Sequence, residues 1–422
     1  MSGKAICVPA TVRRPVILAV RKIILAIALC LAGLSTTSAT PLGSFEQFLQ
    51  SFEAKALQNG ISRDTYRKAT TGLTRDTSIA GLISGQPEFT TPIWTYLERR
   101  VSSSRINRGR AAFARNKSLF TAIGQRYSVD PYILAAIWGI ETDYGAVLGN
   151  RNLIKPVVRS LASLAFERRG RVEQDEAELI AALRLIQDRG YTSQTLVGSW
   201  AGAVGHLQVT PSVLVANATD GNGDGKVDPH NSLADALATS AVLLNSFGYQ
   251  SGLDWGYEVQ LPADFDYALA SRKDFRSVSF FAERGVVRVA GRQFSNLADQ
   301  VFLYLPAGKH GPKFLMTPNY LVLKAYNFSD SYALSVAHLT DRLKGSGPFI
   351  SDWPRNTKFP NLAQRTAIQQ WLKELGFYQG EVDGRIGPIT QEAYQMFQRS
   401  VGLPADGFVT LGAYERLRAA VQ

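Results

Sequence analysis

Residues 130–145, DPYILAAIWGIETDYG, predict a helix that is apolar along almost its whole length. Asp130 is a typical N-cap residue, and Pro131 is favoured at the first helical position. Ten residues without a charge follow Asp130, and Glu141 is the first acid after them. A chain of 422 residues with 45% hydrophobic content is long enough to bury a substantial core. The sequence therefore predicts a globular protein in which this segment is helical.

The position of Glu141 suggests acid chemistry. A carboxyl group at the end of an apolar run lies against apolar side chains, so we expect desolvation to raise the pKa of Glu141. Such an acid holds a proton near neutrality and can give it to a leaving oxygen. Asp143 is a candidate second carboxylate, but residues two apart on a helix point away from each other. Unless the helix ends between them, one acid acts alone, which works among glycosidases when the substrate supplies its own nucleophile. The alternative is that Glu141 only caps or solvates a helix end.

The first 39 residues have the composition of a secretory leader. Five basic residues precede the apolar run 23–34, and small residues 37–39 follow it. A run of this length fits the core of a signal peptide and is too short to span a bilayer comfortably. We therefore expect cleavage after Ala39 and export to the periplasm. A lipoprotein anchored through Cys30 is the less favoured alternative, because Leu29 stands where a small residue would precede the cysteine.

Composition excludes several kinds of chemistry. The two cysteines, Cys7 and Cys30, both lie in the leader, so neither a disulfide nor a cysteine nucleophile remains after cleavage. Removing the five basic residues of the leader lowers the net charge from +11 to +6. This modest excess suits an anionic polymer, whereas no stretch has the interleaved basic and aromatic residues of a nucleic-acid site. The four histidines show no paired zinc-type spacing, and no nucleophile-elbow motif is present.

Periodicity and turn residues predict two domains after the leader. Residues 40–355 are expected to form a mainly α (α+β) catalytic domain, in which residues 254–311, rich in β-branched and aromatic residues, add small strands. Residues 345–360, GSGPFISDWPRNTKFP, are rich in Gly, Pro and Ser and predict a linker. Two similar helix-then-turn units follow, so residues 356–422 are expected to comprise the end of the linker and a small three-helix module.

Six segments of the chain resemble, in order and spacing, the membrane-bound lytic transglycosylase B family. They are ETDYGAVLGN, SLASLAFERRGR, SWAGAVGHLQVTPS, DGNGDGKVD, WGYEVQLP and YNFSDSYALSVAHLTDRL. The similarity begins near Phe45 and covers nearly the whole catalytic region. It implies a lysozyme-like fold. It also implies an enzyme that cleaves the bond between N-acetylmuramic acid and N-acetylglucosamine, closing a 1,6-anhydro ring instead of adding water.

The resemblance also implies site residues. Glu141 matches the family's catalytic acid and base in a Glu-x-x-Tyr-Gly signature whose tyrosine is Tyr144, which we expect to bind substrate. Gln208 matches the glutamine of an Ala-Gly-Ala-x-Gly-x-x-Gln pattern that lines the cleft. The aromatic and hydroxyl contacts to the sugars fall at Tyr96, Tyr326 and Tyr332. Each of these tyrosines, taken alone, is as readily a core residue.

The chain departs from the family near these sugar subsites. Val209 and Thr210 replace a larger apolar pair after Gln208, and His206 and Leu207 are atypical before it. Leu243 stands where a tyrosine is common. These changes bear on substrate preference and leave the acid intact.

The run DGNGDGKVD has the spacing of a calcium loop. Gly225 stands at the sixth position, where such loops turn sharply, and the oxygen donors fall at Asp220, Asn222, Asp224, Asp228 and the Lys226 carbonyl. Position twelve is Asn231 where a bidentate Glu is expected, and the resemblance points instead to Asp235 as the closing ligand. A structural calcium ion and a metal-free Asp/Gly turn are both open here. No cofactor is expected for catalysis.

Residues 362–417 resemble the peptidoglycan-binding domain type one, with Asp383, Gly384 and Gly387 in a turn between its helices. We expect a monomer that binds peptidoglycan glycan strands and no nucleic acid, with the module free to hold the wall on its linker while the cleft samples nearby strands. Other cell-wall enzymes are candidate partners. Two alternatives to the lytic enzyme stay open, a non-catalytic wall-binding protein and a muramidase that uses water.

Overall fold

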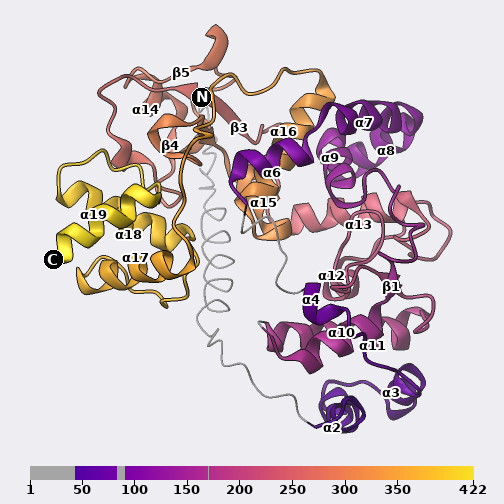
Figure 1. The fold of residues 1–422 in the computed structure, drawn as a ribbon. Coiled ribbons are helices and arrows are strands. Elements are labelled where there is room, and N and C mark those ends of the chain that lie inside the picture. The colour runs from indigo at the N-terminus through magenta and orange to yellow at the C-terminus, as the bar shows by residue number, and fades with distance from the viewer. Residues whose placement is uncertain (1–42, 83–90, 170) are drawn as a thin grey trace, which may run out of the picture.

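The computed structural model describes residues 43–82, 91–169 and 171–422 (Figure 1). The leader expected over residues 1–39 lies outside these ranges. In the part of the chain that is described, no helix has both the length and the apolar character needed to cross a membrane. The described chain is mainly helical with two antiparallel sheets, one of five strands and one of two. The expected fold class, mainly α with a minor β part, is confirmed.

Helix α9 (Pro131–Thr142) is the apolar helix expected from the sequence, and it lies in the main core. The Asp130 carboxylate accepts a hydrogen bond from the Tyr132 amide at 2.9 Å, and Pro131 occupies the first turn. Every residue from Ile133 to Ile140 is buried. A helix that is apolar on all sides needs cover on all sides. Four helices pack against it, namely α7 (Ser103–Arg115), α8 (Lys117–Tyr127), α13 (Leu233–Ser246) and α16 (Asp330–Lys344).

A second group of helices forms a separate core at the other end of the catalytic region (Figure 1). It comprises α2 (Phe45–Gln58), α3 (Arg63–Thr70), α4 (Ile79–Leu82), α10 (Val157–Glu167), α11 (Val172–Arg189) and α12 (Pro211–Asn217). The two-stranded sheet pairs β1 (Lys155–Pro156) with β2 (Val197–Gly198). This pairing holds the start of α10 beside the chain that leads into the predicted glutamine pattern.

The five-stranded sheet has the order β4-β6-β7-β3-β5. Its strands are β3 (Gly256–Gln260), β4 (Arg276–Ser277), β5 (Val287–Arg288), β6 (Gln300–Tyr304) and β7 (Lys313–Met316). Because side chains alternate between the two faces of a strand, Phe302 and Phe314 face the main helical core while Leu303 and Leu315 face a smaller third core. Helix α14 (Val278–Ala282) closes that third core, and the 3₁₀ turns Tyr267–Leu269, Val289–Gly291 and Gly308–His310 connect the strands.

A partly buried ion-pair cluster joins this β part to the helices that follow it, α15 (Pro318–Asn327) and α16. Asp330, the first residue of α16, pairs with Arg272 at 2.6 Å and with Lys324 at 2.8 Å, and it accepts the Tyr320 hydroxyl at 3.0 Å. Burial alone would raise the pKa of Asp330, but the two cations lower it well below its usual value. The cluster therefore keeps its charge and holds the starting turn of α16 in place.

The C-terminal module has three helices, α17 (Leu362–Glu374), α18 (Pro388–Ser400) and α19 (Leu411–Val421). They pack around a core of their own that includes Ile368. Gln369 is fully buried within it. Its amide oxygen accepts the Gly384 amide at 2.6 Å, and its Nε2 donates to the Asp383 carboxylate at 2.9 Å. These bonds account for Asp383 and Gly384 as turn residues, as the sequence predicts.

Residues 345–360 are not the free linker that their composition predicts. The Trp353 and Phe359 rings lie 6.0 Å and 5.8 Å from the ring of Trp94, measured between centroids. Trp94 belongs to α6 (Ile93–Arg100) of the catalytic region. The Ile350 amide donates to the Glu258 carboxylate at 2.9 Å. Glycine, proline and serine make the segment irregular, but its aromatic side chains give it apolar surface to bury, so it forms an ordered strap on the catalytic region.

The module is also docked on the β part, which lies beside it in Figure 1. Gln395 Nε2 of α18 donates to the Tyr267 and Ala270 carbonyls, each at 3.1 Å. Lys273 pairs with Glu392 of the same helix at 2.6 Å. In this structure, directional hydrogen bonds and an ion pair therefore orient the module against the catalytic region.

Candidate active site

Glu141 lies in the last turn of α9, which ends at Thr142. Its side chain is partly exposed, whereas both of its neighbours are buried. The next three residues, Asp143, Tyr144 and Gly145, have left-handed backbones with φ of 51°, 61° and 86°. This conformation is unfavourable for a bulky residue such as tyrosine and persists only where the surroundings hold it. The turn leaves Glu141 as the last partly exposed side chain of an otherwise buried helix.

Asp143 does not join Glu141 in a carboxylate pair. The helix ends between the two, which is the condition under which they could have flanked one bond. Instead, Asp143 Oδ1 accepts from Arg108 Nη2 at 2.9 Å and from Arg105 Nε at 3.4 Å, and both arginines belong to α7. Asp143 is therefore engaged in ion pairs, and Glu141 is the candidate acid of this turn.

Two of the predicted tyrosines stack beside Glu141. The rings of Tyr326, on α15, and Tyr332, on α16, are 6.2 Å apart with an interplanar angle of 9°. Burial, and then the negative charge of Glu141, raises the pKa of both phenols well above the usual value. Tyr96, on α6, contributes a smaller rise to the pKa of Tyr332. The structure thus brings Glu141 and the three predicted tyrosines into one cluster, and both neighbouring phenols keep their protons.

Two members of this cluster are largely inside the protein. Tyr96 is 4% exposed and Tyr332 is 2% exposed. In this conformation the two tyrosines are core residues that lie next to Glu141 and expose little surface to a substrate.

Gln208 lies on a loop that is bonded to the same cluster. Its backbone is left-handed, with φ of 50°, and its Nε2 donates to the Gly205 carbonyl at 2.8 Å. The Tyr326 hydroxyl donates to the Leu207 carbonyl at 2.8 Å and shares a 3.0 Å hydrogen bond with Ser240. Tyr326 therefore connects the glutamine loop to the surroundings of Glu141.

Tyr144 occupies a different place from the one expected of a sugar contact. Its ring packs between Gly109 of α7 and Gly139 of α9, where an added Cβ would come within 2.1 Å and 2.6 Å of its hydroxyl oxygen. It also meets Trp138 edge to face, with centroids 5.6 Å apart. The hydroxyl is buried, with no hydrogen-bond partner among the described residues. In this conformation Tyr144 holds the turn after Glu141 by packing, and its hydroxyl is not exposed to a substrate.

His206 joins α9 to the glutamine loop, and the sequence did not identify it as a functional residue. Trp138 Nε1 donates to His206 Nδ1 at 3.0 Å, and Thr142 Oγ1 donates to the His206 carbonyl at 2.7 Å. Burial lowers the pKa of His206 to about 4, so the ring is neutral near pH 7 and Nδ1 can accept. The only signal in the sequence was a histidine at an atypical position before Gln208.

The predicted metal ligands lie in one loop and, for Asp235, in the first turn of α13 that follows it, but the carboxylates of Asp220 and Asp235 already accept hydrogen bonds from loop amides. Asp220 accepts the Gly223 and Gly225 amides at 2.6 Å and 2.8 Å. Asp235 is 1% exposed and accepts the Gly221 and Asp228 amides, both at 2.9 Å. Asp235 thus closes the loop by hydrogen bonding.

Of the other predicted donors, Asn222, Asp224 and Lys226 lie on the exposed part of this loop, and Asp228 is partly buried. Asp224 accepts the Lys226 amide at 2.9 Å, and Asp228 accepts the His230 amide at 3.1 Å. Over residues 43–82, 91–169 and 171–422, no three Asp, Glu, His or Cys side chains gather as a metal-binding group. The oxygen donors are of the type that calcium prefers, whereas their arrangement here is that of a turn closed by its own amides.

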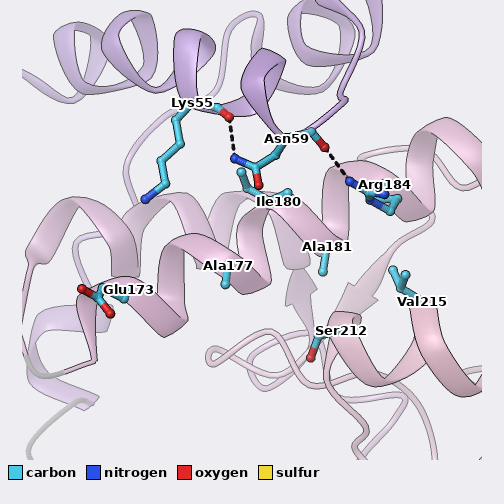
Figure 2. Close-up of a pocket in the computed structure, with 9 residues that line it drawn as sticks. All are labelled: Lys55, Asn59, Glu173, Ala177, Ile180, Ala181, Arg184, Ser212 and Val215. Atoms are coloured by element: carbon cyan, nitrogen blue, oxygen red, sulfur yellow. Dashed lines mark hydrogen bonds between the residues drawn. The ribbon is translucent and has the colours of Figure 1, made fainter. Parts of the chain in front are cut away.

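A cavity of about 320 Å³ lies elsewhere, among α2, α11 and α12. Figure 2 shows Lys55 of α2 and Asn59, which follows the last residue of that helix, opposite Ala177 and Ala181 of α11. None of the predicted catalytic, substrate or metal residues lines it. This cavity is therefore distinct from the site around Glu141.

The helical cores and the glutamate at the end of a buried helix define a class, the lysozyme-like lytic transglycosylases. Residues 44–341 match the family described as the transglycosylase SLT domain, and residues 361–417 match the putative peptidoglycan binding domain. The chain belongs to the transglycosylase SLT domain family. The resemblance drawn from the sequence motifs is confirmed.

Individual relatives are similar over most of the chain. Crystal structures of SltB3 from Pseudomonas aeruginosa, in complex with NAG-anhNAM-pentapeptide or NAG-NAM-pentapeptide, are 39% identical with a TM-score of 0.81. The match covers 89% of this chain and 100% of SltB3. Slt35 from Escherichia coli in complex with calcium is 24% identical, with a TM-score of 0.56 over 71% of this chain and 92% of Slt35, and shows likeness of fold.

A curated relative matches a shorter stretch. The membrane-bound lytic murein transglycosylase B of Escherichia coli (strain K12) is 26% identical over 249 residues, which is 58% of this chain. The chain spans 65% of the length of that relative.

Proposed function

We propose that this chain is a lytic transglycosylase that cleaves the MurNAc–GlcNAc bond of peptidoglycan and leaves 1,6-anhydro-MurNAc ends, with Glu141 as the acid and base. Family membership supports the activity, and the surroundings of Glu141 support the role of this residue. The observation that carries the assignment is that Asp143, the nearest other carboxylate along the chain, is held by two arginines. A mechanism with one protein carboxylate is therefore the one that the turn favours.

In the first step, the protonated Glu141 carboxyl gives its proton to the glycosidic oxygen as the bond from that oxygen to the muramic C1 breaks. The N-acetylglucosamine leaves with the proton on its new hydroxyl. The 2-acetamido group of the muramic acid stabilises the positive charge that develops at C1, replacing a protein nucleophile.

In the second step, the O6 hydroxyl of the same muramic acid attacks C1 and gives its proton to the Glu141 carboxylate. The 1,6-anhydro ring closes, Glu141 regains its proton, and no water is consumed. Tyr332 is a phenol that keeps its proton beside Glu141, so it is suited to stabilise the carboxylate between the two steps. Gln208, Tyr96 and Tyr326 are proposed to bind or support the sugars around this centre, and Tyr144 to hold the turn behind it.

The test is Glu141→Gln, which keeps the shape of the side chain and removes its proton transfer. We expect folding to be retained, by circular dichroism, and kcat on purified sacculi to fall by at least about a hundredfold. Glu173→Gln, at an exposed position of α11, is the matched control and should retain full activity. Activity of Glu141→Gln within about tenfold of the parent would contradict the assignment.

The products separate the two alternative functions from the proposed one. Mass spectrometry of muropeptides released by the parent chain should find anhydro ends, lighter by one water than the reducing ends of a muramidase. Reducing ends would establish the water-using enzyme. Binding of sacculi without release of any muropeptide would establish the non-catalytic wall-binding protein.

We also propose export to the periplasm with removal of residues 1–39, and wall binding by the C-terminal module. The basic and apolar leader supports the first proposal, and the match to the putative peptidoglycan binding domain supports the second. N-terminal sequencing of the exported protein, which should begin at Thr40, tests the cleavage. We also propose a structural calcium ion at the loop that begins at Asp220, which its oxygen donors support; Slt35, a protein of similar fold, is known in complex with calcium.

A further inference from the structure

A second cavity, of about 140 Å³, lies against the tyrosine cluster. It is lined by Thr91, Tyr96, Arg99, Arg100 and Arg105, and we call it the arginine pocket. Three of its five lining residues are cationic. Its volume is well below the several hundred Å³ of a site that encloses a whole small ligand, so it suits one charged group rather than a sugar pair.

Arg105 already has hydrogen-bond partners, and these include the backbone carbonyls at the end of α6. Its Nη1 donates to the carbonyls of Arg99 and Arg100 at 3.4 Å and 2.8 Å, and its Nε donates to Asp143 at 3.4 Å. The carbonyls at the end of a helix need donors, and basic side chains of the last turn often supply them. Here Arg105 supplies them for α6, so the guanidinium groups of Arg99 and Arg100 are not needed for that purpose.

Arg99 and Arg100 carry charge that the described protein does not neutralise. Among residues 43–82, 91–169 and 171–422, the one ion pair made by a pocket arginine is that of Arg105 with Asp143. The Arg100 guanidinium lies over the Tyr96 ring at 5.2 Å from its centroid, which orders the side chain without neutralising it. The pocket therefore has a net positive charge and one pre-positioned guanidinium.

The pocket adjoins the site around Glu141 through two shared residues. Tyr96 forms one wall of the pocket and contributes to the raised pKa of Tyr332, which lies beside Glu141. Arg105 forms another wall and binds Asp143, two residues after Glu141. A group held in the pocket would thus lie next to a substrate bound at Glu141.

We propose that the arginine pocket binds a carboxylate of the peptide carried by the muramic acid, so that the enzyme prefers glycan strands that bear peptides. This inference rests on the proposed function, since it concerns the same substrate. Where a peptide is attached, the lactyl carboxyl of the muramic acid is held in an amide bond, so the sugars offer neutral acetamido, amide and hydroxyl groups, whereas the peptide ends in a carboxylate. A guanidinium binds a carboxylate with two parallel, charge-assisted hydrogen bonds, which selects this group over a neutral one.

The experiment measures binding in the full chain carrying Glu141→Gln, so that no substrate is consumed. Isothermal titration calorimetry compares three probes: NAG-NAM-pentapeptide, the same compound with its peptide carboxylates amidated, and NAG-NAM without peptide, whose free lactyl carboxyl is capped as a methylamide so that it carries no charge. We expect the first probe to bind about tenfold more tightly than the other two, as loss of a hydrogen bond to a charged group implies. Adding Arg99→Gln and Arg100→Gln should remove this preference and leave the affinity for NAG-NAM unchanged.

Arg115→Gln is the matched control, because it removes the same charge from an exposed position at the far end of α7. It should keep the preference for the peptide carboxylate. Equal affinity of the parent background for all three probes would overturn the proposal, as would an equal loss for NAG-NAM in the Arg99 and Arg100 variants. Failure of the proposed catalytic function would appear separately, as missing activity in the chain with Glu141 intact, and would leave the binding comparison readable.

Discussion

Alanine at Gly109 is expected to destabilise the turn that follows Glu141 through a direct clash with Tyr144. A Cβ at this position would lie 2.1 Å from the Tyr144 hydroxyl oxygen, 2.6 Å from its Cζ and 2.7 Å from Leu343 Cδ2. Gly109 is itself buried within α7. The Tyr144 ring cannot easily move away from Gly109, because it also packs closely against Gly139 of α9, where an added Cβ would lie 2.5 Å from its Cζ.

The expected change in the free energy of unfolding of Gly109→Ala follows from two opposing effects. Over-packing of a core costs about 1–3 kcal/mol, while alanine in place of glycine inside a helix contributes about 1 kcal/mol in the other direction. The net loss should be about 1–2 kcal/mol. Tyr144→Phe alone should be close to neutral, because its buried hydroxyl has no partner among the described residues. In the double variant it removes the nearest clash and should restore about half of the loss.

The assay is thermal unfolding followed by tryptophan fluorescence, together with kcat and KM on soluble glycan fragments. Gly139→Ala is the control, because its Cβ would meet the ring carbon Cζ at 2.5 Å, and Tyr144→Phe leaves that atom in place. Rescue by Tyr144→Phe should therefore be smaller at Gly139 than at Gly109. A Gly109→Ala variant as stable as the parent would refute the packing argument. A severalfold rise of KM in Tyr144→Phe would instead support the sequence-based prediction that the Tyr144 hydroxyl contacts the sugar directly.

Three further outcomes are expected. The pKa of His206 is lowered to about 4 in the folded chain from an ordinary 6.5, so its contribution to stability is complete above about pH 6.5 and is lost as the pH falls through 4. The melting temperatures of the parent and of His206→Asn should therefore converge as the pH falls from 6.5 to 4. A constant difference between them would contradict this. Calcium in excess over chelator should raise the melting temperature with little effect on the rate, and an unchanged value, matching that of an Asp220→Ala and Asp224→Ala double variant, would remove the metal proposal. Deleting residues 361–422 should lower both the melting temperature and the cleavage of short soluble glycans, because it removes the Phe408 ring that contacts Phe359 and exposes the surface of the β part that binds the module. Loss of activity on intact sacculi alone would favour the tether.

Local features of the chain were predictable from the sequence. The apolar run after Asp130 predicted a buried helix, which is present, although it ends at Thr142 and not at the end of the predicted segment 130–145. The motifs around Gln208 and in the last sixty residues identified the family and the module. These predictions succeeded because helix capping, apolar periodicity and family motifs are properties of neighbouring residues, which the sequence presents directly.

Tertiary packing alone decided which side chains meet at the site. Asp143 turns to arginines of α7, about 35 residues earlier in the chain, and Trp138 binds His206, 68 residues later. The composition of residues 345–360 predicted a linker, because the sequence does not show that the aromatic residues of this segment pack on Trp94. In each case the partner comes from an element remote in sequence. Hydrogen bonds and close packing depend on positions to within a fraction of an ångström, and only the assembled helices and sheet set these positions.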